Sequence, residues 1–324
     1  MDLLAGLSNF WVKPPLVALI IFLMSGWVFC PLLALWARLA EASSRRVFYN
    51  NLARQICQAA LAAAVPTLLG LGALAAWQLS KGAAAPFAAN ISALPGLALF
   101  AAFFLLQLAA LLSWKNLRQA APLQLLLLAL TALAALGAVV LLFSSLLSPL
   151  CGAGLDLAQA AARYSLFNVD YSAAWAFAGS LGLIGLTLAA VWSVCWLFFR
   201  RNRDDFGRDY YNFAAGRGCA LAFTAGAASL LAYAALLVLA QPGCFSAALP
   251  AGELSFAPLV PLAPLAVIAL HVVCCILWFS AARAASPLRH KAALWLSLLL
   301  WTGALALACQ VAHSYYLASI AQKI

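Results

Sequence analysis

The chain has 324 residues, of which 67% are hydrophobic and only 8% are charged. A soluble domain carries about 25% charged residues, so this composition excludes a soluble globular fold. In a soluble protein the net charge of +10 would suggest a nucleic-acid partner. Here the basic residues lie in short segments between long apolar runs, which excludes that partner and favours a protein built into a lipid bilayer.

Eight apolar runs follow one another along the chain. Each has about 20 residues or more, which is enough for an α-helix to cross about 30 Å of hydrocarbon. The sequence therefore predicts an all-α, multi-pass membrane protein with about eight transmembrane helices. The predicted spans lie near residues 15–37, 56–79, 93–114, 122–147, 174–199, 218–241, 258–281 and 292–317.

The basic residues are distributed unequally between the two sides of these spans. Of the 18 lysines and arginines, all but Lys13, Lys81, Arg163 and Lys323 fall on one side. The side rich in Lys and Arg faces the cytoplasm by the positive-inside rule. We therefore expect both termini on the outer face and the protein in the inner (cytoplasmic) membrane.

The segment after the first span is similar to the segment after the fifth. Identical residues recur 162 positions apart, as the pairs Arg38/Arg200, Arg46/Arg208, Tyr49/Tyr211, Asn50/Asn212 and Cys57/Cys219. Trp114 and Trp278 end the third and seventh spans at nearly the same offset. This pattern predicts two tandem four-helix repeats that share one orientation, residues 1–150 and residues 151–324.

The repeated segments combine arginine with aromatic residues. Such a combination is typical of an interfacial anchor, with rings at the headgroups and guanidinium groups on lipid phosphate. A docking surface for a cytoplasmic or membrane partner is the alternative. The residues that carry either role are Arg46, Tyr49, Asn50, Arg54, Arg208, Tyr211, Asn212 and Arg217.

The first of these segments resembles a known family. Tyr49, Leu52, Ala53 and Arg54, placed after a first helix with an outer N-terminus and a short basic loop, resemble the start of subunit I of cytochrome bd-type quinol oxidases. That family is also built from tandem four-helix bundles. The resemblance implies a membrane subunit of an electron-transfer complex that is linked to quinone or haem.

The sequence departs from the family pattern at the residues that carry oxygen chemistry. The family has a haem-ligating histidine near the outer end of its first helix, and the first predicted span here has none. The family has carboxylates within the membrane, whereas the eight Asp and Glu residues here all fall outside the predicted spans. We therefore predict a non-catalytic subunit and assign no catalytic residue.

His271 is the first candidate for cofactor binding, because it lies near the middle of the seventh predicted span. An ionisable residue at that depth is a functional candidate. Met24 lies near the middle of the first span, so ligation of a haem b by His271 and Met24 is one hypothesis. The alternatives are a neutral His271 that is hydrogen-bonded to a neighbouring helix, and a quinone or substrate contact.

A second candidate lies at the outer face. His313 and Gln310 fall near the outer end of the eighth predicted span, and Arg163 falls in the outer loop before the fifth. His313 could accept a proton or a hydrogen bond from a quinol head group there. The alternative is that this outer loop forms a helix lying on the membrane surface.

The nine cysteines form no metal-binding signature, because no Cys-x-x-Cys spacing is present. No metal site is therefore predicted. Cys151 and Cys244 both fall in predicted outer loops, which makes them a candidate disulfide. Two other functions also fit the sequence: a small-solute or lipid transporter, because tandem repeats are typical of transporters, and a membrane scaffold or assembly protein without a ligand.

Overall fold

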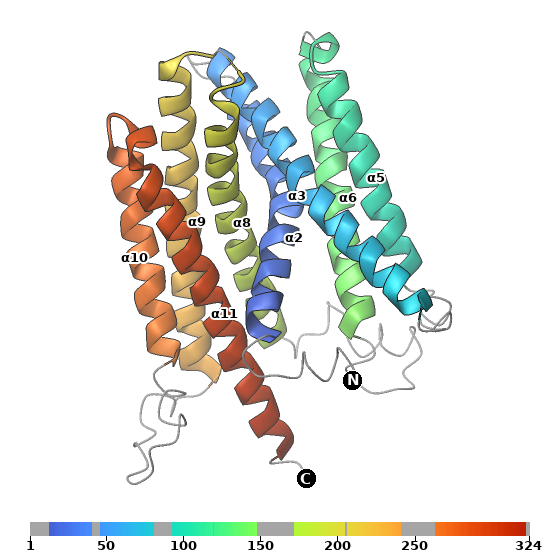
Figure 1. Ribbon diagram of the computed structural model, residues 1–324, viewed down its shortest axis with the longest axis vertical. Helices are drawn as coiled ribbons and strands as arrows, with labels where there is room; N and C mark the ends of the chain where they lie inside the picture. Colours follow the sequence, from blue (N-terminus) through green and yellow to red (C-terminus); the bar gives the residue numbers. More distant parts are fainter. Residues whose placement is uncertain are drawn as a thin grey trace. The chain divides into compact units, whose positions relative to one another are not determined.

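The computed structural model describes residues 13–40, 46–80, 93–118, 120–147, 172–204, 206–240 and 263–321 (Figure 1). The described residues form eight long α-helices, all of them long and apolar enough to cross a membrane. The prediction of an all-α, multi-pass membrane protein is therefore confirmed. The helices are α2 (Lys13–Leu39), α3 (Arg46–Ser80), α5 (Ala93–Leu112), α6 (Ala121–Leu147), α8 (Ser172–Arg200), α9 (Arg208–Ala240), α10 (Ala263–Arg283) and α11 (Lys291–Ala321).

Two helices begin well before the apolar runs that predicted them. The helix α3 begins at Arg46 instead of near residue 56, and α9 begins at Arg208 instead of near residue 218. An apolar run marks only the part of a helix that lies in hydrocarbon, whereas backbone hydrogen bonds continue through the polar turns beside it. The repeated arginine and aromatic segments are therefore the first turns of α3 and α9.

The chain divides into two compact units. Unit 1 comprises Met1–Phe22 and Ala176–Ile324, and unit 2 comprises Leu23–Trp175. Unit 1 thus holds α8 from Ala176 onward, α9, α10 and α11, together with the first turns of α2. Unit 2 holds the rest of α2 together with α3, α5 and α6.

The core of unit 1 is built around α10, which packs against both α9 and α11. Two glycines of α9 bring its neighbours close. A Cβ atom at Gly218 would overlap the side chain of Val194 on α8, and a Cβ atom at Gly226 would lie 2.7 Å from Cζ3 of Trp278 on α10. Small residues at such points let helix backbones approach closely, which is how membrane helices pack.

The core of unit 2 is built around the antiparallel pair α5 and α6. The pair is close at Gly137, where a Cβ atom would lie 2.8 Å from Cδ1 of Leu99. Trp27 of α2 packs against α5, with ring centroids 4.7 Å from Phe100 and 5.3 Å from Phe103. The helix α3 contacts α5 over a shorter stretch.

Candidate functional site

His271 lies midway along α10 and is buried, with 3% of its surface exposed. Its Nε2 lies 2.8 Å from the carbonyl oxygen of Gly226 and 3.1 Å from Oγ of Ser229, both on α9. A carbonyl oxygen can only accept a hydrogen bond, so Nε2 must carry the proton. The Ser229 hydroxyl donates to the same carbonyl oxygen over 2.9 Å. His271 therefore links α10 to the backbone of α9.

A second set of contacts links α10 to α11 beside His271. The Trp278 Nε1–H donates to Oγ of Ser297 over 2.8 Å, and the Ser297 hydroxyl donates to the Leu294 carbonyl oxygen over 2.8 Å. The ring of Trp301 meets that of His271 edge to face, with centroids 3.9 Å apart. The side chains of α10 thus hold α9 on one side and α11 on the other.

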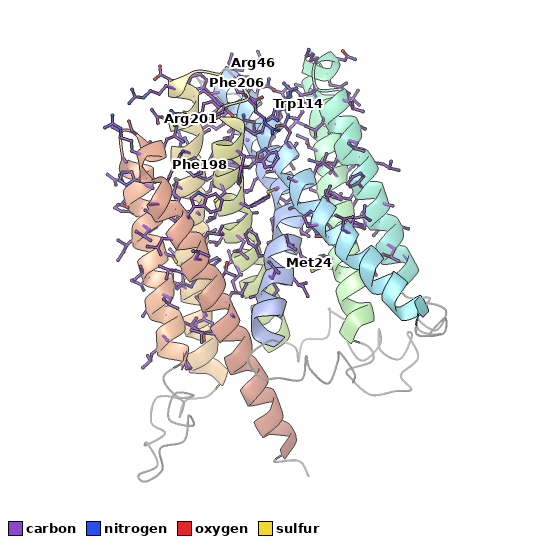
Figure 2. All side chains as sticks on the ribbon, in the orientation of Figure 1. Met24, Arg46, Trp114, Phe198, Arg201 and Phe206 are labelled. Atoms are coloured by element: carbon purple, nitrogen blue, oxygen red, sulfur yellow. The ribbon has the colours of Figure 1, made fainter. Side chains whose placement is uncertain are left out.

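This arrangement bears on the proposed haem ligand. Histidine binds a metal through a ring nitrogen that has a free lone pair; here Nε2 carries the proton, so that nitrogen is Nδ1. Of the three hypotheses for His271, the geometry favours a neutral side chain that is hydrogen-bonded to a neighbouring helix. Met24 is half-buried on α2 within unit 2 (Figure 2), so its pairing with His271 stays a prediction.

The described residues offer no cluster for a metal ion, since no three His, Cys, Asp or Glu side chains come together among them. The candidates for a quinone contact and a disulfide at the outer face lie in other parts of the chain. Arg163, Cys151 and Cys244 lie outside the described residues, and the side chains of Gln310 and His313 do so too. The quinone contact and the disulfide therefore stay predictions.

The repeated segment of unit 1 closes the turn between α8 and α9. Arg200 forms a bidentate ion pair with Asp204, with Nε–Oδ2 and Nη2–Oδ1 distances of 2.9 and 2.6 Å. The Tyr211 hydroxyl reaches back from α9 and donates to the Asp204 carbonyl oxygen over 2.9 Å. Figure 2 shows Arg201 and Phe206 at this end of unit 1. Tyr211 is therefore buried in the fold, where it holds a turn.

The other predicted anchor residues divide by exposure. Tyr49 and Asn50 are buried in unit 2, and the Tyr49 ring meets Trp36 edge to face at 6.1 Å. Asn212 and Arg54 are half-buried. Three guanidinium groups are exposed and stay candidates for contact with lipid phosphate or a partner, namely those of Arg46, Arg208 and Arg217.

Tyr211→Phe tests the role of the Tyr211 hydroxyl. This change removes the hydrogen bond to the Asp204 carbonyl and keeps the ring, so we expect a loss of about 0.5–1.5 kcal/mol in the free energy of unfolding. Thermal unfolding of the purified protein in mild detergent measures it. Tyr233→Phe on the same helix is the comparison, because it removes a hydroxyl outside this turn. An unchanged melting temperature for Tyr211→Phe would show that the hydroxyl does not hold the turn.

Sequence reasoning missed the counterpart of His271 in unit 2. The buried residues of α5 recur on α10 at an offset of 164 positions. The buried face of α5 includes Phe100, Phe103, Gln107, Ala110 and Trp114. The corresponding buried residues of α10 are Pro264, Val267, His271, Cys274 and Trp278. Gln107 thus corresponds to His271. Its Nε2 donates to the Cys57 carbonyl oxygen of α3 over 2.9 Å. In both units, a side chain of the third helix donates to a backbone carbonyl of the second. The offset between Trp114 and Trp278 was the signal that could have found it.

Comparison with protein-family models, with curated proteins and with solved structures found no match. The resemblance to subunit I of cytochrome bd-type oxidases therefore depends on the segment around Tyr49 and Arg54 alone.

Proposed function

We propose that the protein is an integral membrane subunit of a quinone- or haem-linked electron-transfer complex, to which it contributes helices and no catalytic centre. The observation that carries the proposal is the repetition of a four-helix pattern. The same face of the third helix is buried in each unit, and a buried tyrosine lies at the start of each second helix. The resemblance to cytochrome bd-type subunits, which are tandem four-helix bundles, supplies the class of complex.

The proposed topology has two repeats of one orientation, with both termini outside. It is supported by the charge around one end of unit 1, where the α8–α9 and α10–α11 turns meet and Arg208 Nη2 donates to Oγ of Ser286 over 3.3 Å. Exposed cations surround these turns, and a cytoplasmic location for them follows the positive-inside rule. They are Arg201, Arg203, Arg208, Arg283, Arg289 and Lys291.

Two contacts of His271 and its neighbours support a role in helix packing. The Nε2 atom is engaged with the Gly226 carbonyl oxygen, and α9 and α10 approach so closely there that a Cβ atom at Gly226 would lie 2.7 Å from Trp278. In the proposed complex we therefore assign His271 to helix packing. The quinone contact of His313, Gln310 and Arg163 stays a prediction from the sequence.

A visible spectrum of the purified protein, reduced by dithionite minus air-oxidised, tests this proposal together with organic extraction. We expect no haem band from the chain alone, and either extractable quinone or a co-purified partner that carries a redox group. The His271→Gln variant should behave like the parent protein, because Gln at the corresponding position 107 also donates to a backbone carbonyl. A haem band at about one per chain that disappears in His271→Gln would return His271 to the role of ligand.

A scaffold or assembly protein is the second candidate, and one observation favours it. In the centre of unit 1, the side chains of His271, Ser229, Trp278 and Ser297 all bond to one another or to backbone. The same purification separates the two functions. A stoichiometric partner without haem or quinone would support a scaffold and contradict the electron-transfer proposal.

A further inference from the structure

Buried polar atoms without a hydrogen-bond partner occur in both units of the described structure, and more of them lie in unit 2; in unit 1 they include Nε1 of Trp196 and of Trp301. On α3, on α5 and in the first turn of α6, several buried nitrogen and oxygen atoms have no hydrogen-bond partner in the described part of the chain. They are both amide atoms of Gln124, Oε1 of Gln107, Nε1 of Trp114, Oδ1 of Asn50, Oε1 of Gln58 and Nε of Arg54. Gln107 and Gln124 are fully buried, at 0% exposure.

These atoms lie at two levels of unit 2. Gln107 and Trp114 are seven residues apart on one face of α5, and Asn50 and Cys57 are seven residues apart on one face of α3. The Gln107–Cys57 hydrogen bond fixes the level at which the two antiparallel helices meet. Trp114 therefore lies at the level of Asn50, about 10 Å from the level of Gln107. Gln124 lies in the first turn of α6, directly after the α5–α6 turn, and so falls near the level of Trp114.

Leaving such groups unpaired is unfavourable. A buried polar group without a partner costs about 1–3 kcal/mol, and almost all buried polar groups in native proteins are satisfied by protein, by ordered water or by a ligand. The unpaired atoms include donors, on Gln124, Trp114 and Arg54, and acceptors, on Gln107, Asn50 and Gln58. The described residues of unit 2 include no Asp or Glu. This chemistry suits a neutral molecule that both donates and accepts hydrogen bonds.

We propose that the region beside the α5–α6 turn, where α3, α5 and α6 reach the same level, binds a small neutral molecule through hydroxyl or carbonyl oxygen, held by Trp114, Gln124 and Asn50. Ordered water and the polar group of a membrane-soluble compound share this chemistry. A buried water makes about three hydrogen bonds to otherwise unsatisfied groups, which suits this set. The site assigns neither haem nor a redox partner, and an extracted compound is assigned to it only where Gln124→Leu abolishes its recovery.

Unit 1 provides an internal control for this site. Trp278 corresponds to Trp114, and its Nε1–H is already bonded to Ser297, whereas that of Trp114 is unpaired. Both indoles are buried, at 0% and 3% exposure. A difference in water access between the two therefore cannot come from surface exposure alone.

Hydroxyl-radical labelling of the wild-type protein in detergent is the first test, because radicals formed from bound water oxidise the side chains next to it. We expect Trp114 to be oxidised several-fold faster than Trp278, as measured by peptide mass spectrometry. Organic extraction of the same sample separates the two sources. A compound recovered at about one per chain identifies a membrane-soluble molecule, and labelling without such a compound identifies water. Equal protection of both tryptophans with no compound extracted would overturn the proposal.

Gln124→Leu is the second test. It gives one result if Gln124 hydrogen-bonds a bound molecule and the opposite result if Gln124 has no partner. If Gln124 holds a bound molecule, the change removes both of its hydrogen bonds and we expect a lower melting temperature and loss of any extracted compound. If Gln124 is unpaired, the change removes a buried polar penalty and the melting temperature rises, which would overturn the proposal. Should the variant fail to fold, the labelling of the wild-type protein decides. The visible spectrum, which tests the electron-transfer proposal, is unaffected by either outcome.

Discussion

Trp278→Ala is expected to lower the free energy of unfolding by about 3–5 kcal/mol, the usual cost of truncating a buried tryptophan. Trp278 has 0% of its surface exposed and lies where α9, α10 and α11 meet. Its ring packs against Trp301, with centroids 5.7 Å apart, and covers Gly226. The change removes these contacts together with the hydrogen bond to Ser297, and the surrounding helices can fill the resulting cavity only in part.

Thermal unfolding in mild detergent measures this effect, and we expect a fall of roughly 6–15 °C in Tm. Trp295→Ala is the matched control, because Trp295 lies on α11 of the same unit and is 37% exposed. Its truncation should shift Tm much less. Equal shifts for the two variants would show that the meeting point of α9, α10 and α11 is not the core of unit 1.

The helices could be predicted because their cause is local. A run of apolar residues as long as that in α6 must bury its backbone hydrogen bonds inside a helix once it is in hydrocarbon. The polar first turns of α3 and α9 were missed because the prediction used only the apolar runs. Nothing in the hydropathy of Arg46 or Arg208 indicates that the helix already includes them, although Asp209 in the first turn of α9 interacts favourably with the helix dipole.

The environment of His271 could be predicted only as a set of alternatives. Its position within an apolar run already indicated burial, but its role depends on which atoms of α9 face it. Those atoms are the Gly226 carbonyl oxygen and the Ser229 hydroxyl of α9. Because α9 contains many small residues, its sequence does not indicate which of them face His271. Gln107 was missed because a neutral amide in a span carries no charge that would single it out.

Gly226→Ala is expected to destabilise unit 1, although the same substitution is usually favourable inside a helix. Alanine is preferred over glycine there by about 1 kcal/mol. At this position, however, the new Cβ atom would lie 2.7 Å from Cζ3 and 3.2 Å from Cε3 of Trp278. The indole is buried and bonded to Ser297, so it cannot swing away, and overpacking of this kind costs about 1–3 kcal/mol.

Gly303→Ala on α11 separates the steric effect from helix propensity, because a Cβ atom there meets nothing within 4 Å. We expect Gly303→Ala to leave Tm unchanged or to raise it slightly, and Gly226→Ala to lower it. Combining Gly226→Ala with Trp278→Phe identifies the cause, since a phenyl ring lacks the outer part of the indole. The penalty of Gly226→Ala should then shrink, as expected for residues in direct contact. A penalty that persists in the Trp278→Phe background would mean that α9 meets some other obstacle at Gly226, and the close approach that places the Gly226 carbonyl beside His271 would lose its explanation.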